Sequence, residues 1–496
     1  MKKDNQVISM RLHLPDLRNP RWTAFGGTWT TGSSWIKPAA MPALVTEFND
    51  AGAPYVHVLV RENKEHKPDH VSLTLAPDGV QITAGTFGTA PVYLVAAGEV
   101  LYGAWDLADL HPYLRTDRLV PRVVARTLTR QHRYTADTLF EGVYRLTERA
   151  TASFDHAGLA VHYPEPAEHV LQPRALRSGV DPLDAFDALL TDVVRDVPTV
   201  RGRVGVELSG GADSANVALA VKAAGFPRVH SFGLLVGGNL GAAQRERRIA
   251  IAEHCGFADT AIPALQQPPF VPGGVRAARR PHDPAGAFYQ EAFDVLRDQA
   301  AARECTVVFT GNGGDEINSC HSRTHARLPE PPEVPWLGRR AVDVLPDVDA
   351  ALAPMPVLPV PTLMGFAMHN PGYLRVGIWP VSPLVNPRIV RFMEQLPHEH
   401  KRGKAMFRQR LRRAGLPESV AAPAEPENFL MVMEAGLRMF GLPVLDDMLR
   451  ESLLVDLGYV DPKALAQAKE DAMAAPVVPD LLCDVLALEV GLRTLT

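Results

Sequence analysis

Short apolar runs rich in β-branched residues dominate the chain from about residue 55 to residue 165. Gly, Pro and Asp separate these runs at roughly hairpin spacing, which is typical of strands joined by tight turns. The runs are Val56–Val60, Val71–Ala76, Val80–Gly85, Val92–Ala97, Val100–Trp105, Arg149–Asp155 and Leu159–Tyr163. The pattern therefore predicts a layered, β-rich domain with a few helices.

The periodicity changes after residues 164–181, which are rich in proline and charge and indicate a linker. Apolar residues then recur at helical spacing over Pro182–Val197, with Asp181 as the N-cap. Strands are predicted at Val204–Leu208, Val229–Leu235 and Thr306–Gly311, and helices at Ser214–Gly225, Ala242–Gly256 and Ala287–Cys305. This alternation predicts a parallel sheet covered on both faces.

The two patterns together predict an α/β protein of two domains, at residues 1–175 and 176–496. The second domain is expected to become mostly helical towards Thr496. A length of 496 residues fits two or three domains. A composition of 46% hydrophobic and 22% charged residues is that of a soluble globular protein.

Net charge and cysteine spacing limit the partners and the cellular compartment that we expect for this protein. The net charge of −5 gives no sign of a nucleic-acid partner. The first residues lack the apolar core of a secretion signal, and no run of 18 apolar residues suggests a membrane span. The four cysteines, at positions 255, 305, 320 and 483, have no metal-ligand or disulfide spacing. We therefore expect a cytoplasmic protein with reduced thiols.

A glycine-rich loop follows the first predicted strand of the parallel sheet. It contains Ser209, Gly210, Gly211 and Asp213, and a helix is expected from Ser214. Glycines let the backbone approach an anion, hydroxyls add donors, and a helix N-terminus carries partial positive charge, so the loop suits a phosphate. The carboxylate suits a Mg²⁺ ion that accompanies polyphosphate. The Walker pattern is absent, and a capped turn is the alternative.

A second loop of the same kind follows the strand predicted at Thr306–Gly311. It contains Gly311, Gly313 and Asp315 within the sequence TGNGGDE. The carboxyl ends of parallel strands lie at one edge of a sheet, which is where ligands bind. Asp213 and Asp315 are therefore expected to share metal ions that neutralise phosphate charge.

The two loops resemble motifs of a known family. SGGADS (209–214) looks like the pyrophosphate loop of the N-type ATP pyrophosphatases. Together with TGNGGDE (310–316) it resembles the synthetase domain of asparagine synthetase, which β-lactam synthetases and lasso-peptide cyclases share. The resemblance covers most of residues 180–430. More weakly, Gly85–Leu114 resembles the glutamine-hydrolysing (Ntn) domain that precedes it in these proteins.

This resemblance implies a reaction and a set of ligands. ATP would activate a carboxylate as an acyl-adenylate, with release of pyrophosphate, and an amine would then attack the adenylate. Pyrophosphate and Mg²⁺ would be held by Ser209, Gly210, Gly211, Asp213, Ser214, Gly311 and Gly313, and Asp315 would complete the metal site. The backbone at Phe232 and Leu234 would face the adenine. For these two residues, an ordinary buried strand end is the alternative.

The first departure from the family lies at the N-terminus. Family members that hydrolyse glutamine use a cysteine exposed by removal of the initiator methionine, and its thiolate is the nucleophile. Here residue 2 is Lys2, and Cys255 is the first cysteine. The N-terminal domain is therefore expected to be a scaffold or a docking surface. The amine would already be part of the substrate.

Two further departures concern the part of the site where the amine would react with the adenylate. Trp379 stands where many members carry a glutamate, and Tyr373 is a candidate proton carrier for which a structural role is the alternative. Glu425 stands near the place of a family lysine.

Lys404 lies upstream and matches another lysine of the family. It is the candidate cation for the transition state. Its spacing from Arg408 and Arg412 predicts one helical face, and a solvated basic helix is the alternative.

The leading hypothesis is an AMP-forming, ATP-dependent amide synthetase of natural-product biosynthesis. It would close a β-lactam or a peptide macrolactam, or form an intermolecular amide, on a small-molecule or peptide substrate. A lasso-type enzyme would also have a precursor peptide or a protease as partner. The alternatives are a non-catalytic nucleotide- or peptide-binding protein, an ammonia-using asparagine synthetase-like enzyme, and an amidating enzyme of the GMP- or NAD-synthetase type.

Overall fold

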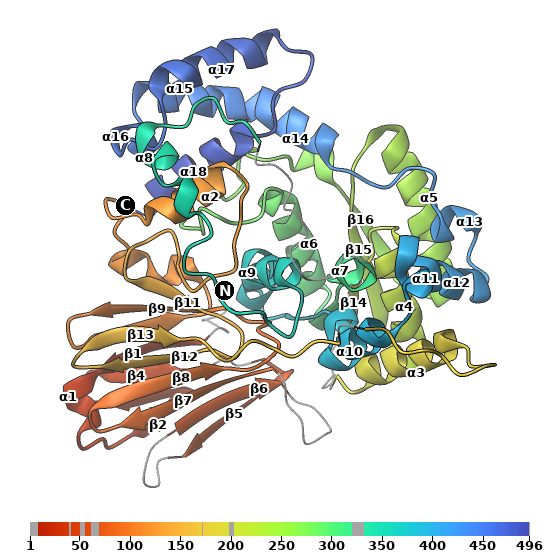
Figure 1. Cartoon of the computed structure of the whole chain (residues 1–496), viewed down its shortest axis with the longest axis horizontal. Coiled ribbons are helices and arrows are strands. Elements are labelled where there is room, and N and C mark those ends of the chain that lie inside the picture. The colour runs from red at the N-terminus through yellow and green to blue at the C-terminus, as the bar shows by residue number, and fades with distance from the viewer. Residues whose placement is uncertain are drawn as a thin grey trace.

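The computed structural model describes residues 8–38, 41–49, 55–60, 69–170, 172–197, 203–319 and 332–495. Lys2 and Cys320, which entered the sequence predictions, lie outside the described residues. Figure 1 shows an N-terminal β-rich half beside a half built on a parallel sheet, with helices of the C-terminal region above both. Among the described residues, no helix is both long and apolar enough to cross a bilayer.

Two antiparallel sheets form the N-terminal half. The seven-stranded sheet has the order β11-β9-β10-β1-β4-β3-β2, and the six-stranded sheet has the order β13-β12-β8-β7-β6-β5. The strands are β1 (Ser9–His13), β2 (Thr23–Phe25), β3 (Thr28–Thr31), β4 (Ser34–Lys37), β5 (Leu44–Asn49), β6 (Tyr55–Val60), β7 (His70–Ala76), β8 (Gly79–Ala84), β9 (Val92–Ala97), β10 (Val100–Ala104), β11 (Val143–Leu146), β12 (Thr151–Asp155) and β13 (Gly158–His162). Alternate side chains of strands such as β1 and β7 are buried, so each sheet gives one face to the core.

The sequence analysis predicted strands only from about residue 55 and missed the first strands of this half. β1 to β5 precede residue 55, and several of them are short and polar, such as β3 with the sequence TWTT. Strands of three or four residues have too few positions to show an alternating pattern. They form because the sheet supplies their neighbours, since β1 pairs with both β10 and β4.

Five parallel strands form the third sheet, in the order β16-β15-β14-β17-β18. They are β14 (Arg203–Glu207), β15 (Val229–Leu235), β16 (Ala258–Pro263), β17 (Cys305–Phe309) and β18 (Trp379–Val381), and the pattern had not predicted β16 and β18. Val307 and Phe309 of β17 belong to one core cluster and Val308 to another, so both faces of the sheet are covered. The predicted fold class, a β-rich N-terminal part followed by an α/β part, is confirmed.

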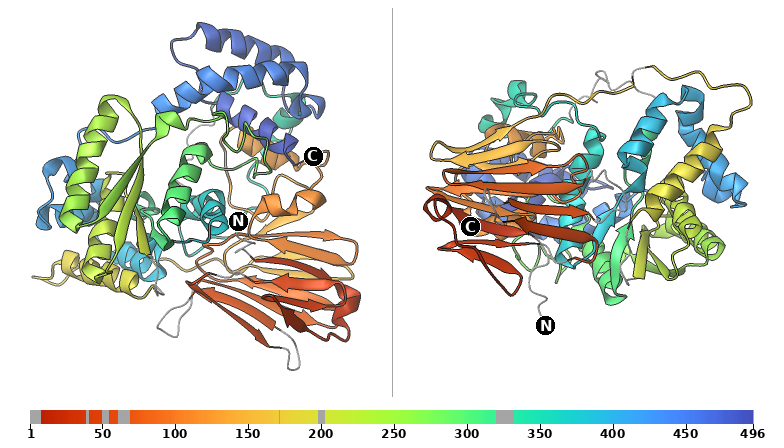
Figure 2. Two further views of the ribbon diagram at one scale, coloured as in Figure 1. Left: turned by 180° about the vertical axis from the view of Figure 1, so that it is seen from behind. Right: turned by 90° about the horizontal axis from the view of Figure 1, so that it is seen from below.

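Helices lie in both parts of the chain: the first two belong to the N-terminal part, several later ones cover the parallel sheet, and the last ones pack together in the C-terminal region. They are α1 (Leu14–Leu17), α2 (Pro121–Leu128), α3 (Pro182–Arg195), α4 (Ala212–Ala224), α5 (Gly238–Cys255), α6 (Gln290–Ala302), α7 (Gly314–Asn318), α8 (Arg339–Val342), α9 (Val360–Arg375), α10 (Pro387–Gln395), α11 (His398–Lys401), α12 (Ala405–Arg413), α13 (Glu418–Ala421), α14 (Leu430–Gly436), α15 (Leu442–Arg450), α16 (Leu453–Asp456), α17 (Pro462–Ala474) and α18 (Leu482–Arg493). Asp181 caps α3 as predicted, by accepting a hydrogen bond from the Leu183 amide. The stretch before α3 runs in extended form from the β-rich half to the second half (Figure 2).

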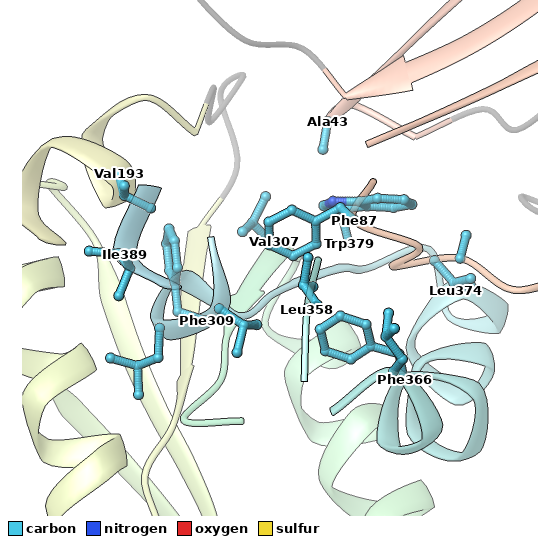
Figure 3. Close-up of a cluster of buried hydrophobic side chains, with 14 of the residues drawn as sticks. Ala43, Phe87, Val193, Val307, Phe309, Leu358, Phe366, Leu374, Trp379 and Ile389 are labelled. Carbon is cyan, nitrogen blue, oxygen red and sulfur yellow. The ribbon is translucent and has the colours of Figure 1, made fainter. Parts of the chain in front are cut away.

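One apolar cluster joins the two halves beside β18. Ala43 and Phe87 of the N-terminal half lie in the same cluster as Trp379 and Val307 (Figure 3). The ring centroids of Trp379 and Trp105 are 6.0 Å apart. Trp379, for which the resemblance had raised a glutamate as the usual residue, is therefore part of the core between the halves.

Candidate functional site

The loop that follows β14 is folded by its own serines. The Ser209 and Ser214 hydroxyls are 3.0 Å apart, and the Gly211 amide donates to the Ser209 hydroxyl at 3.1 Å. Gly210 has a φ of +92°, a conformation that glycine adopts without strain. The loop therefore leads from the buried strand into the N-terminus of α4 with its hydroxyls and amides gathered at the carboxyl edge of the sheet.

The second loop, between β17 and α7, lies directly against the first. An ideal Cβ on Gly311 would stand 2.9 Å from the Ser214 amide nitrogen, and one on Gly314 would overlap the Asp213 carboxylate. Gly313 has a φ of +87° and precedes α7. Any larger side chain at 311 or 314 would thus push the loops apart. The structure brings together all the loop residues that the sequence analysis named, although these lie about 100 positions apart in the chain.

A single ammonium group joins the two loop carboxylates. The Lys404 Nζ lies 2.7 Å from the Asp213 Oδ2 and 2.7 Å from the Asp315 Oδ1. Burial alone would lower the pKa of Lys404, but the two carboxylates outweigh it and hold that pKa above its ordinary value. Burial raises the pKa of Asp213 in spite of the lysine. The arrangement places a fixed positive charge at the meeting point of both loops.

The carboxylates also fit a Mg²⁺ ion. The Asp213 Oδ1 is buried and receives no hydrogen bond from any described residue, so it keeps a free acceptor. Mg²⁺ is usually bound by one or two carboxylates together with waters and substrate phosphates. Within the described ranges, no group of three or more His, Cys, Asp and Glu side chains is placed to hold a metal ion. Asp213 and Asp315 can supply carboxylate oxygens of this kind.

The expectation that Lys404, Arg408 and Arg412 share one face of a helix is wrong. Lys404 precedes α12 as its N-cap and has a left-handed φ of +59°. The chain turns there, after Gly403 with a φ of +58°, and this turn points the lysine at the loops. Arg412 forms an exposed ion pair with Glu418 instead. Helical spacing could not reveal the turn, because it depends on the packing of the loops that the lysine contacts.

Tyr373 is buried inside the second half of the molecule, with 1% of its surface exposed. Its hydroxyl donates to the Glu207 carboxylate at the end of β14, and burial raises the pKa of both groups. The Arg297 guanidinium lies over its ring, 5.2 Å from the centroid. This enclosure favours the structural role that the sequence had left as the alternative.

Phe232 and Leu234 lie at the carboxyl end of β15, where the adenine had been expected. The Phe232 carbonyl accepts a hydrogen bond from the Leu208 amide at 2.7 Å. The Leu234 carbonyl accepts one from the Gln244 side chain at 2.9 Å. Both carbonyls are thus engaged within the protein, which favours the alternative of an ordinary buried strand end.

Two residues at the first loop were missed by the sequence reasoning. Arg247 of α5 and Glu427, which follows α13, form an ion pair beside Gly210. Arg247 lies in a predicted helix and Glu427 only two positions after Glu425, which had been noted. Neither has a motif around it, so only the folded chain places them at the site.

A charged cavity of about 240 Å³ lies between the two halves, away from the loop residues named above. Asp106 of the N-terminal half, Asp283, and Arg297 and Arg375 of the second half are among its lining residues. His282 also lines it, and its Nε2 is buried without a hydrogen-bond partner among the described residues. Such a lining suits a small charged molecule.

The two loops lie at the carboxyl edge of a parallel sheet that follows two antiparallel sheets in the chain. Residues 185–358 match the asparagine synthase family. This match over part of the second half agrees with the resemblance of the two loops to the asparagine synthetase-like proteins. The match supports, at a coarse level, an ATP-dependent enzyme that forms carbon–nitrogen bonds.

Similar solved structures are distant. A U34-tRNA thiolase, NcsA, from Methanococcus maripaludis is 11% identical with a TM-score of 0.28 and covers 58% of this chain and 80% of its own. An NH₃-dependent NAD synthetase from Campylobacter jejuni is 16% identical with a TM-score of 0.21 and covers 50% and 100%. The glutamine PRPP amidotransferase of B. subtilis is 7% identical with a TM-score of 0.21 and covers 51% and 90%. Likenesses this distant do not bear on the activity of this chain, and no curated protein sequence matches it.

Proposed function

We propose that this chain is an AMP- and pyrophosphate-forming amide synthetase that adenylates a carboxylate for attack by an amine. The observation that carries the proposal is the bridge from Lys404 to Asp213 and Asp315 at the junction of the two glycine-rich loops. Two carboxylates and a cation at the N-terminus of α4 match the needs of a metal-bound triphosphate. A tight turn that binds no ligand would not require two carboxylates and a lysine at this position.

Each group has a distinct task in this proposal. The hydroxyls of Ser209 and Ser214 and the amides around Gly210 and Gly211 would bind the departing pyrophosphate. Asp213 and Asp315 would hold Mg²⁺, which when bound neutralises charge on the phosphates. Lys404 would stabilise negative charge that develops as the adenylate forms and reacts. Fixed charges of this kind act without reorganisation at the moment of reaction.

The amine is proposed to belong to the substrate rather than to come from glutamine. The described cysteines at 255, 305 and 483 are all buried. Burial raises the pKa of the first two thiols to about 11 and that of the third to about 12, so they are poor nucleophiles at neutral pH. Amide formation within a small molecule or a peptide, as in natural-product biosynthesis, fits this arrangement. A lasso-type reaction would add a precursor peptide or a protease as partner.

The test is formation of AMP and pyrophosphate from Mg-ATP with pools of amino-acid derivatives and peptides. We expect exchange of labelled pyrophosphate into ATP with at least one carboxylate, and its loss in Asp213→Asn. Asp456→Asn, in α16 far along the chain, is the control. Tight ATP binding without AMP from any pool would overturn the proposal in favour of a non-catalytic nucleotide-binding protein. Full activity of Asp213→Asn would overturn the assignment of the metal ligand.

A further inference from the structure

A carboxylate lies against the face of the first loop. The Glu427 Oε1 and Oε2 stand 3.3 Å and 3.7 Å from the positions that a Cβ would take on Gly210 and Gly211. These are the two glycines whose missing side chains open the loop to an anion. The carboxylate is itself an anion, and 15% of the Glu427 side chain is exposed.

Arg247 connects this carboxylate to the loop. Its Nε donates to the Gly210 carbonyl at 3.2 Å, and its Nη2 donates to the Glu427 Oε1. Only 6% of the Arg247 side chain is exposed, so the guanidinium is fixed in place from α5. A planar guanidinium binds carboxylates and phosphates through the same donors.

Glu427 belongs to a segment that crosses the carboxyl edge of the sheet. Residues 422–429 join α13 to α14 without helix or strand, and prolines stand at 423 and 426. Just beyond, the Met431 sulfur is 3.2 Å from the position of a Cβ on Gly238, the first residue of α5, which follows β15. The segment therefore lies over the loop that follows β14 and the start of α5.

We infer that Arg247 is a phosphate-binding residue and that Glu427 is its counterion only until the nucleotide binds. This inference rests on the proposed function, because it assumes that the first loop binds the phosphates of Mg-ATP. A carboxylate and a polyphosphate repel each other over a few ångströms, so they compete for the same glycines and the same guanidinium. Binding of the nucleotide then moves Glu427 and its segment away and transfers Arg247 from carboxylate to phosphate.

The test measures Mg-ATP affinity of the full-length protein by calorimetry. Glu427→Gln removes the competing charge at constant size, and we expect affinity to rise by about tenfold. Arg247→Met should lower it by about tenfold or more. Glu425→Gln, exposed two residues earlier, and Arg245→Met, exposed on the same helix, are the matched controls and should bind as the wild type does.

The outcomes separate this inference from the proposed function. If the wild type binds Mg-ATP and Glu427→Gln binds no more tightly, the competition is overturned, whatever becomes of the adenylation activity. If neither protein binds, both ideas fail. Arg247→Met is interpreted only where its melting temperature matches that of Arg245→Met. If it does not fold, Arg247→Lys, which keeps the charge but not the planar donors, should bind less tightly than the wild type, and equal binding would overturn the role of Arg247.

Discussion

Replacing Lys404 by methionine should destabilise the folded protein at neutral pH. The variant keeps most of the apolar stem and removes only the ammonium that lies 2.7 Å from a carboxylate oxygen of Asp213 and 2.7 Å from one of Asp315. Two carboxylates are then left side by side without a cation. One of them, Asp213, has 17% of its side chain exposed and cannot be fully solvated.

The distances set the size of the effect. Because both oxygens contact one nitrogen, they lie at most about 5.4 Å apart. Two unit charges at this separation repel by about 3 kcal/mol at an effective dielectric constant of about 20. Asp315 is 81% exposed, so solvent screens much of this repulsion. We therefore expect the free energy of unfolding to fall by about 1–3 kcal/mol, which for 496 residues corresponds to a decrease in Tm of roughly 1–3 °C.

The pH dependence of the effect follows from the pKa shifts. The folded-state pKa of Lys404 is raised, so its contribution is complete below the ordinary lysine pKa and is lost only at strongly alkaline pH. At the acid end, the difference between variant and wild type should shrink as the pH falls through the raised pKa of Asp213, because protonation removes the repulsion. The loss of stability is thus greatest between weakly acidic and mildly alkaline pH.

Thermal unfolding at several pH values, with EDTA or with Mg²⁺, is the assay. Mg²⁺ should raise the Tm of Lys404→Met more than that of the wild type, because the ion takes the place of the missing ammonium between the carboxylates. Lys463→Met, at an exposed position of α17, is the control and should be close to the wild type. Equal Tm values for wild type and Lys404→Met at pH 7, with the same response to Mg²⁺, would refute the reasoning.

Three further substitutions test separate parts of the structure. Gly314→Ala would place its Cβ on the Asp213 carboxylate, so we expect loss of pyrophosphate exchange and a lower Tm. Gly365→Ala, where a Cβ meets nothing within 4 Å, is the control and should keep the exchange activity and the Tm of the wild type. Exchange retained in Gly314→Ala would contradict the close packing of the two loops. Burial raises the pKa of Asp283 to about 6. Its protonation therefore contributes fully to the stability of the fold below about pH 4, and this contribution is lost as the pH rises through 6. Asp283→Asn should therefore match the wild type near pH 4 and be more stable by about 1–3 kcal/mol at pH 8, as urea unfolding would show, and a constant difference would exclude this titration. Tyr373→Phe leaves a buried carboxylate without its donor and should cost about 1–3 kcal/mol in urea unfolding. Loss of exchange at unchanged stability would instead make this phenol a catalytic group.

The two glycine-rich loops and their carboxylates were predictable from local sequence. Strand residues followed by Gly, Ser and Asp at the start of a helix form one continuous stretch, so the elements around Asp213 and Asp315 could be predicted without knowledge of the fold. The parallel arrangement then required both loops to lie at one edge of the sheet. The alternation of strands and helices over residues 204–311 was equally local, and it gave the fold class.

Contacts between distant segments could not be predicted in this way. Lys404 reaches both aspartates only because the chain turns before α12, and Glu427 reaches the first loop only because residues 422–429 cross the sheet edge. Trp379 stood at a position of chemical interest in the sequence, yet it packs against Trp105 of the other half. Hydrophobic periodicity and motifs depend on neighbours along the chain, whereas ion pairs and packing depend on neighbours in space. The two glycine-rich loops are thus determined by the local sequence. The basic and acidic side chains that contact these loops, such as Lys404 and Glu427, are brought there by tertiary packing.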